Sequence, residues 1–436
     1  MKYKLIGEAL NEVYKELIGE SELVKEDLSN IVEVGKTITD NINYGENVEN
    51  YTKKLIDKVG RIIFRQNNLE LSHLPIFRDS WEFGSIAEKV RVEAPATSED
   101  RTFDLSNYTG EDVFKLSIPK TSAKFFNNST TFQLKISLPK VQVKSAWNSA
   151  REMSQFISLI ENSIKQKLAV DLLSLEYRTQ ANLIAEKFKS GNSNCLINLL
   201  EEYIYETGDT SVTSEKFLTN EKALRFANKK IKMMRNLITK PSILYADGGY
   251  VNVTAPNEQV LTILTDFDAS LATYLYSVNR HNDFVKLENY TVVPYWQSGG
   301  TSDDYETRSK IKVIPASEGA IPSGEDTRMI IEEDNILAIL QDYRASAVTC
   351  QHSDVESINV PDARMINYWY FEDANYVNDT DENVIIFYLS DYSRLGKFAE
   401  KPVDFGSTYY TKSGLTYTPC NSSEFDSNTV YYAKLV

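Results

Sequence analysis

Two aspartates in one short segment are the residues whose spacing most directly suggests chemistry. Asp266 and Asp268 flank Phe267, and a DxD triplet of this kind can hold a divalent cation in an enzyme that uses nucleotide sugars. The same segment also reads as the opening of a helix, where aspartates stabilise the amino-terminal end by capping and by their interaction with the helix dipole. We favour the second interpretation and expect a structural role for both aspartates.

The other candidate sites have weaker support. The histidines His73, His281 and His352 occur in no HExxH motif and in no pair four residues apart, so neither a histidine metal site nor a catalytic triad is indicated. Gly248-Gly249 is not part of a phosphate-binding pattern and is expected to form a turn. The acidic segment 373–382 lacks the spacing of an EF-hand and is expected to be a solvated loop.

The aromatic residues do not form a recognisable binding surface. The four tryptophans are scattered and are not interleaved with basic residues, so we expect them in the core or at subunit contacts: Trp81, Trp147, Trp296 and Trp369. We therefore predict no catalytic, cofactor-binding or metal-binding residues and no cofactor. For a chain of 436 residues this absence favours a structural protein over an enzyme.

The composition restricts the function further. The net charge of −15 argues against a protein that grips nucleic acid through its phosphates, and the basic run Lys229, Lys230, Lys232 and Arg235 is expected to be a solvated helix face. No apolar run approaches the roughly twenty residues of a membrane span, and the amino terminus lacks the features of a secretory signal. Three widely separated cysteines indicate neither a disulfide framework nor a zinc site, which fits a reducing cytosol.

One long helix dominates the predicted structure. Residues 149–189 contain no proline, and Ser149 with Glu152 forms a capping-box pattern at the start. Charged residues, namely Arg151, Glu161, Lys165, Lys167 and Glu176, are expected to lie mostly off the buried stripe and in solvent. That stripe recurs every three or four residues: Met153, Phe156, Ile157, Ile160, Ile164, Leu168, Leu172 and Leu175.

An extended region precedes this helix. Residues 81–147 alternate apolar and polar side chains in EKVRVEA, DVFKLSIP and TFQLKISLPKVQVKSAW, which predicts strands. The edges of such a β arm present unpaired backbone groups, and a neighbouring subunit could cover them.

The rest of the chain is expected to be mixed. Between residues 190 and 330 we predict a helix from Ser214 to Leu237 with Ser214 as a possible N-cap, a strand in PSILYAD, a helix in TDFDASLATYLYSV and a strand in NYTVVPYW. Residues 299–328 are expected to form a mobile surface loop, and the apolar runs of 329–392 to form strands. Two similar pieces within 405–436, each with Tyr-Tyr-x-Lys, predict a small β module.

Three stretches carry a resemblance to a known family. YTKKLIDKVGRIIFRQ, SAWNSAREMSQFISLIENSIKQKLAVDLLSL and LTDFDASLATYLYSVNRHNDFV occur in an order that resembles the major capsid proteins of small podophages of the phi29 type, over residues 51–390. The resemblance implies an α+β, Hong Kong 97-like capsid fold with an amino-terminal arm, an extended loop near 79–143, a spine helix and an axial domain near 205–325. A carboxy-terminal module of 405–436 is too short for an immunoglobulin-like domain.

The implied domains divide the chain as follows: amino-terminal arm 1–66, extended β loop and start of the peripheral domain 67–147, spine helix 148–204, axial domain 205–328, return strands of the peripheral domain 329–395, and carboxy-terminal β module 396–436. The function implied is that of a major capsid protein that self-assembles, as hexamers and pentamers, into the icosahedral virion shell around double-stranded DNA. The expected partners are further copies, a scaffolding protein and a portal, with no membrane and with assembly in the host cytoplasm. The alternatives are a tail or baseplate subunit and, less favoured, a cation-dependent glycosyltransferase using Asp266 and Asp268.

Overall fold

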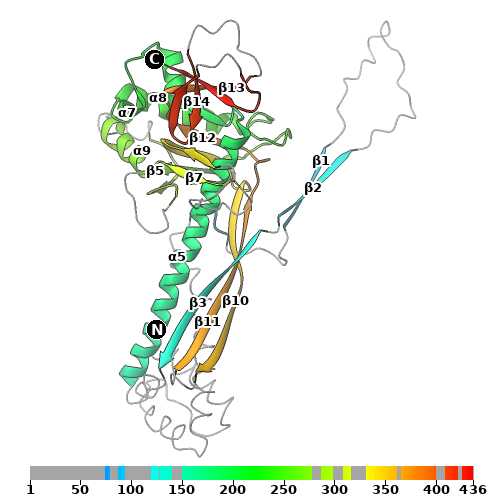
Figure 1. Ribbon diagram of the computed structural model, residues 1–436, viewed down its shortest axis with the longest axis vertical. Helices are drawn as coiled ribbons and strands as arrows, with labels where there is room; N and C mark the ends of the chain where they lie inside the picture. Colours follow the sequence, from blue (N-terminus) through cyan, green and yellow to red (C-terminus); the bar gives the residue numbers. More distant parts are fainter. Residues whose placement is uncertain are drawn as a thin grey trace, which may run out of the picture.

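A long helix joins a rounded body to an extended arm (Figure 1). The computed structural model describes residues 74–78, 87–93, 119–126, 128–139, 150–276, 286–297, 308–315, 330–360, 365–398, 408–420 and 425–435. The amino-terminal arm at 1–66 and the segment DVFKLSIP, apart from Pro119, lie outside these residues. Within the described part, no helix is both long and apolar enough to cross a membrane.

The predicted spine helix is present as α5, Ala150–Ser190. Ile164, Leu168, Leu172 and Leu175 are all buried, which confirms the described half of the apolar stripe. The structure does not describe the side chains of the other four stripe residues, of the proposed Ser149–Glu152 capping box, or of Arg151, Glu161 and Lys165.

The solvated position expected for Glu176 is wrong. Its side chain is fully buried, and Oε2 accepts a hydrogen bond from the backbone N–H of Leu74 at 2.7 Å. The carboxylate is buried because it satisfies a backbone donor of a distant segment, which helical periodicity does not reveal. Lys167, by contrast, is exposed as expected and pairs with Asp171.

A three-stranded antiparallel sheet runs along the spine helix (Figure 1). It consists of β3, Ser129–Pro139, β10, Ser346–Val360, and β11, Met365–Asn378, in the order β10-β11-β3. Leu134 pairs with Tyr370 and Ile136 with Tyr368, so one face of the sheet is apolar. Both tyrosines are fully buried, and on the other face Lys135 lies 5.3 Å from the Trp369 ring. The strands expected in TFQLKISLP and RMINYWYFEDANYV are confirmed.

The body is built on a five-stranded mixed sheet. Its order is β4, Leu196–Asn198, β12, Val384–Tyr388, β9, Ile336–Asp342, β5, Gln259–Leu264, and β6, Thr291–Val293. Every residue of β9 and β12 is buried, because their continuous apolar runs occupy the middle of a sheet covered on both faces. The sheet therefore joins segments of the chain that the sequence analysis assigns to three different units.

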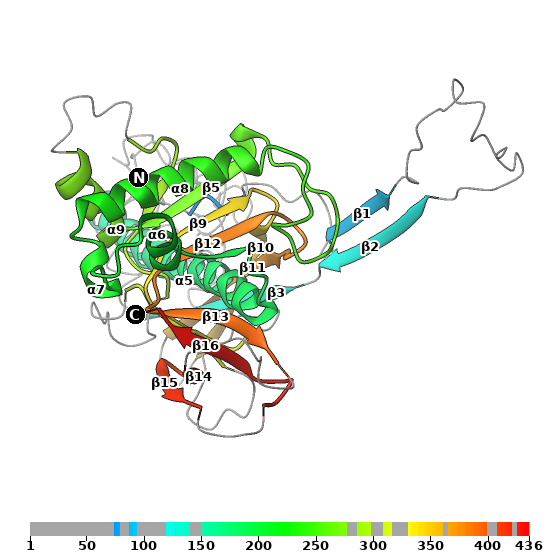
Figure 2. The same ribbon diagram turned by 90° about the horizontal axis from the view of Figure 1, so that it is seen from above.

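Helices cover one face of this sheet, and α5 lies on the other (Figure 2). The covering elements are α6, Leu199–Thr207, α7, Ser214–Phe217, α8, Glu221–Leu237, α9, Thr265–Ser270, and a π-helical turn, Leu271–Tyr276. The helix predicted in TDFDASLATYLYSV is confirmed through Tyr276, and the strand in NYTVVPYW is β6. Trp296 lies in the core, as expected.

The single helix expected from Ser214 to Leu237 is wrong. The chain breaks between α7 and α8, where the Asn220 side chain caps α8 by accepting from the backbone N–H groups of Lys222 and Ala223 at 2.9 and 3.3 Å. Ser214 is not an N-cap either. It is the first residue of α7, and its hydroxyl donates to Asp391 at 2.6 Å.

Two further predictions are corrected. PSILYAD forms no strand beyond an isolated bridge between Ser242 and Asn252, because it turns at the surface and leaves Ile243 and Leu244 about half exposed. The segment 299–328 contains a strand, β7, Ile311–Val313, which pairs with β8, Ile331–Glu333, because Ile311 and Val313 enter the core. Only residues 308–315 of that segment are described.

The carboxy-terminal residues form a four-stranded sheet. Its order is β13, Tyr392–Lys397, β16, Val430–Lys434, β14, Tyr409–Ser413, and β15, Thr416–Pro419, which confirms the predicted β strands. The two Tyr-Tyr-x-Lys pieces are neighbouring antiparallel strands, with Tyr410 opposite Tyr432. The module is attached to the body by Lys412, which is largely buried and pairs with Glu333 at 2.5 Å.

The spine helix offers a matched pair of substitutions. Leu175→Ala removes a side chain that is 1 % exposed, and we expect it to lower the free energy of unfolding by about 2–5 kcal/mol. Val170→Ala removes one that is 60 % exposed on the same helix and is expected to change that energy by less than about 0.5 kcal/mol. Urea unfolding of both variants measures the difference, and equal effects would contradict this packing of α5.

Candidate assembly surface on the projecting hairpin

A two-stranded ribbon projects from the body (Figures 1 and 2). It consists of β1, Ala87–Glu93, and β2, Lys120–Phe126, which pair antiparallel from Ala87 with Phe126 to Glu93 with Lys120. We call these two strands the hairpin. An isolated two-stranded ribbon is marginally stable in water, so contacts outside its own backbone ladder must hold it in place.

The outer face of the hairpin is apolar and exposed. Val90, Val92 and Phe125 are 60, 65 and 61 % exposed, and they lie on the same face because Val90 is opposite Ala123 and Phe125 is opposite Glu88. The alternation that placed strands here in the sequence therefore continues in the structure, but with the apolar side chains facing solvent. A partner surface could bury them.

The inner face of the hairpin is basic and contacts an acidic turn. This turn, Asp379, Thr380, Asp381 and Glu382, connects β11 to β12. Lys89 pairs with Asp379 and, at 2.5 Å, with Glu382, while Arg91 pairs with Glu382 at 3.0 Å. Lys124 pairs with Asp379 at 2.9 Å and with Asp381 at 3.1 Å. We call this network the clasp.

The clasp corrects the prediction of a solvated acidic loop at 373–382. The first six residues of that segment complete β11, and the Asp379 and Glu382 side chains are only 2 and 8 % exposed. Buried carboxylates require a compensating charge, and here the cations come from residues 255 to 293 positions away in the sequence. The alternation of basic and apolar residues in KVRVE is visible in the sequence, but the sequence does not show that the basic side chains face the acidic turn.

Further contacts fix the base of the hairpin. The Arg91 guanidinium lies over the Tyr250 ring at 4.8 Å and donates to Oδ1 of Asn252 at 3.0 Å. The Tyr250 hydroxyl in turn donates to Oγ of Ser122 at 3.2 Å. Gly248 leaves room beside this site, since a Cβ there would lie 2.7 Å from Oδ1 of Asp381. Gly248-Gly249 is thus a turn, as predicted, and one that a larger residue would push into the clasp.

The spine helix holds the acidic turn from behind. Lys187 of α5 is fully buried, and its Nζ donates to the backbone oxygen of Thr380 at 2.9 Å and pairs with Asp247 at 3.1 Å. The Asp247 N–H also donates to the Thr380 oxygen, at 3.1 Å. One turn therefore connects the hairpin to the last turns of α5.

Protonation equilibria at the clasp reflect two opposing effects. Burial disfavours the charged form of Asp379, but the hydrogen bonds from Lys89 and Lys124 outweigh it, so the pKa of Asp379 is lowered. Burial likewise acts to lower the pKa of Lys124, and its hydrogen bonds and attraction to Asp379 and Asp381 leave that pKa raised. Both groups are stabilised in their charged forms by docking of the hairpin.

The residues first considered for chemistry do not converge. Asp266 pairs with Arg308 at 3.2 Å, and Asp268 accepts from the Tyr290 hydroxyl at 2.8 Å. Both lie in the first turn of α9, where the dipole argument applies, but the N-cap is Leu264, so side-chain capping is wrong. The structure does not describe His73, His281, Trp81, Trp147 or the side chain of His352.

The basic run on α8 lies at the surface, and two of its lysines are paired. Lys229 pairs with Glu206, and Lys230 pairs with Glu202 at 2.9 Å. Within the described part of the chain, no group of three or more histidine, cysteine, aspartate or glutamate side chains is placed to hold a metal ion. Cys195 is a buried thiol, and Cys350 is a partly exposed one.

Removal of the central carboxylate should loosen the hairpin. We expect Asp379→Asn to lower the free energy of hairpin opening by about 1–3 kcal/mol, because Lys89 and Lys124 lose a charged partner while remaining partly solvated. Amide hydrogen exchange of residues 87–93 and 120–126 measures this energy, with β9 as the internal reference. Asp381→Asn, at a more exposed carboxylate, is the matched control and should have a smaller effect.

The clasp should also respond to pH at both extremes. Because the pKa of Asp379 is lowered, its contribution is present above about 3.9, the value of a free aspartate, and is lost as pH falls through the docked value. Because the pKa of Lys124 is raised, its contribution is present below about 10.4 and is lost as pH rises through the docked value. Hairpin protection should therefore be constant between these limits. A decline near pH 6 to 7 would contradict the assignment.

Comparison with known proteins identifies the family. A family model described as Phi29-like phage major capsid protein matches residues 10–388, which is most of the chain. No curated protein matches the sequence.

Several solved phage structures match part of the chain at low sequence identity. The capsid structure of Staphylococcus phage Andhra is 8 % identical with a TM-score of 0.48, over 74 % of this chain and 86 % of that one. A head fibre and inner core protein structure of bacteriophage P68 is 13 % identical with a TM-score of 0.45, over 74 and 86 % of the two chains. The capsid of cyanophage P-SCSP1u is 11 % identical with a TM-score of 0.38, over 74 and 87 %.

The family match selects between the functions that the sequence left open. It favours a capsid subunit over a tail or baseplate subunit and over a glycosyltransferase, and it places the protein in the virion. The carboxy-terminal sheet, from Tyr392 onward, lies beyond the matched residues. The chain belongs to the Phi29-like phage major capsid protein family, and its function is that of a phage major capsid protein.

Proposed function

We propose that the chain self-assembles as hexamers and pentamers into the icosahedral shell that encloses the double-stranded DNA genome of a tailed phage. The observation that carries this proposal is the hairpin, whose apolar outer face projects away from the body and is exposed in a single copy. A soluble chain gains by burying such a face against another subunit. In a shell, each hairpin lies on the neighbouring copy.

The clasp supports this role because it orients the hairpin before any neighbour arrives. A ribbon held by five ion pairs loses less conformational freedom on docking than a free one, so more of the contact energy appears as affinity. The exposed outer edges of β1 and β2 can also pair with a neighbour's backbone. The hairpin is thus suited to receive a partner on its face and at its edges.

We further infer a Hong Kong 97-like arrangement of the chain. In this proposal residues 1–66 form the amino-terminal arm, 67–147 include the extended loop with the hairpin, 148–204 contain the spine helix, and 396–436 contain the carboxy-terminal module. Two details are adjusted to the sheets. β9 is grouped with the axial segment 205–328 because it pairs with β5, and β12 goes with it because β12 pairs with β9, while β13 is grouped with the module. The remaining strands of 329–395, β10 and β11, return to the peripheral domain along α5.

The partners follow from the shell. Besides further copies, we propose a scaffolding protein and a portal, assembly in the host cytoplasm, and no membrane. The DNA is enclosed without sequence-specific binding, in keeping with a net charge of −15 and with lysines on α8 that are paired within the chain. The chain acts as a shell subunit and carries out no catalysis.

The hairpin face provides the direct test. We expect the double variant Val92→Asp with Phe125→Asp to retain the fold, because both side chains are more than half exposed, and to lose shell formation, because a partner would have to bury two carboxylates. Electron microscopy and light-scattering mass measure assembly, with the scaffold supplied if the unmodified chain requires it. Circular dichroism reports the fold.

Leu415→Asp, at an exposed apolar residue of the carboxy-terminal module, is the matched control and should assemble normally. Intact shells from the double variant would show that the hairpin face is not a contact. Tubes or a strict monomer from the unmodified chain, even with its scaffold, would refute the shell itself.

A further inference from the structure

The two sides of helix α8 differ in charge, and the proposed role of the hairpin gives neither side a function. Ala227, Ile231 and Met234 form the buried stripe of this helix. Lys230 and Arg235 are five positions apart, which places them about 140° apart around the helix with that stripe between them. They therefore leave the body on opposite flanks of α8.

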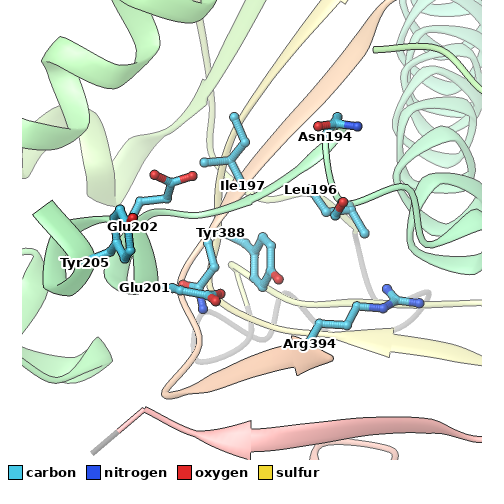
Figure 3. A pocket seen from close by; sticks show the side chains of 10 residues that line it. Asn194, Leu196, Ile197, Glu201, Glu202, Tyr205, Tyr388 and Arg394 are labelled. Atoms are coloured by element: carbon cyan, nitrogen blue, oxygen red, sulfur yellow. The ribbon is translucent and has the colours of Figure 1, made fainter. Parts of the chain in front are cut away.

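The Lys230 flank carries helix α6 and is acidic and aromatic. Glu202 and Glu206 of α6 pair with Lys230 and Lys229, and Figure 3 shows Glu201, Glu202 and Tyr205 grouped beside a cavity of about 420 Å³. Tyr205 is 90 % exposed, which is unusual for a large aromatic side chain on a regular helix. With Glu201 and Asp209, this segment has more carboxylates than the two lysines that pair with it. We call it the α6 flank.

The Arg235 flank holds a basic groove of about 540 Å³. Three cations line it, Lys232, Arg235 and Lys286, against one carboxylate, Glu288. The rest of the lining is Pro256 together with residues that carry amide and hydroxyl groups, namely Asn236, Thr239, Gln259 and Asn289. The groove therefore suits an occupant that supplies carboxylates.

Arg235 is positioned for such an occupant. Its Nε donates to Oε1 of Gln259 at 3.1 Å, and its Nη1 donates to the backbone oxygen of Glu288 at 2.6 Å. These bonds fix the guanidinium plane, yet within the described residues no carboxylate lies in salt-bridge distance of it. Burial lowers the pKa of Arg235 more than the attraction of Glu288 raises it, so the lost hydration of this charge is only partly compensated. A carboxylate in the groove would restore that compensation through charge-assisted hydrogen bonds.

A second copy of this chain is the occupant that these features favour. Copies with a net charge of −15 repel one another, so contacts between them require locally complementary charge. A contact between two different surfaces on opposite flanks is head-to-tail, and such a contact forms a closed ring when the rotation between successive copies closes. An acidic flank and a basic groove on either side of one helix meet both requirements.

We propose that the α6 flank of one copy docks into the basic groove of the next copy around a ring of subunits. This inference rests on the proposed shell function and names the surfaces that would join subunits within one hexamer or pentamer. Tyr205 supplies the apolar anchor, and the carboxylates around it face Arg235 and Lys286. Buried aromatic anchors surrounded by polar pairs are the usual arrangement of strong contact sites.

Cysteine cross-linking tests the contact in assembled particles. Tyr205→Cys chains and Asn236→Cys chains are mixed, assembled and mildly oxidised, and we expect covalent dimers that link position 205 of one copy to position 236 of another. Both residues are exposed, so neither change should affect folding. Tyr205→Cys mixed with Ser413→Cys, at an exposed position of the carboxy-terminal module, is the control. The unmodified chain under the same oxidant gives the background from Cys195, Cys350 and Cys420.

Charge reversal gives an independent readout. Arg235→Glu should reduce the yield of rings or shells at least tenfold, whereas Lys434→Glu, at an exposed lysine of the carboxy-terminal module, should leave it within twofold. Circular dichroism verifies that both variants are folded, and Lys286→Glu, at an exposed lysine of the same groove, replaces the Arg235 reversal if that variant does not fold.

The outcomes separate this inference from the shell function. Shells that form normally but give no 205–236 link above the control overturn the proposed contact and leave the shell intact. Failure of the unmodified chain to form any capsomer, even with its scaffold, overturns both.

Discussion

The buried carboxylates of the turn between β11 and β12 are the constraint on which the arrangement of this molecule depends. That turn follows β11 of the three-stranded sheet and leads into β12 of the five-stranded body sheet, so its position sets the relation between the two sheets. Asp379 and Glu382 are almost completely withdrawn from water, and such groups persist as anions only beside cations. The hairpin supplies those cations from the outside, and Lys187 of the spine helix holds the turn from the inside.

This arrangement explains how a marginal element is kept in one orientation. The hairpin has no core of its own, and its apolar face is turned away from the body. Charge and hydrogen bonds fix its inner face instead, and the cation–π contact between Arg91 and Tyr250 adds a second direction of support. The apolar surface is thereby kept for intermolecular use while the monomer remains stable without it.

Apolar and charged residues have similarly distinct roles elsewhere in the structure. Within the body, apolar residues of β9 and β12 and of the covering helices form the core, whereas ion pairs join the acidic turn to the hairpin and a hydrogen bond from Lys187 joins it to the spine helix. The carboxy-terminal module follows the same pattern, since Lys412 attaches it to Glu333 of β8. In a capsid protein, polar contacts of this kind can orient the hairpin and the carboxy-terminal module without enlarging the hydrophobic core. The unequal flanks of α8 fit the same logic.

The sequence alone determined those elements that local periodicity specifies. Side-chain spacing records which face is buried, and it therefore predicted the spine helix, the strands β3 and β11, the buried runs of β9 and β12, and the paired Tyr-Tyr-x-Lys strands. The family was also readable from the order of three sequence stretches. The helix caps were not predictable from the sequence. Asn220, and not Ser214, caps helix α8. The clasp, the buried positions of Glu176 and Lys187, and the turn in PSILYAD were decided only by tertiary structure. In each case the position of a polar group or an apolar run depends on a partner that is distant in the sequence, and no local pattern identifies that partner.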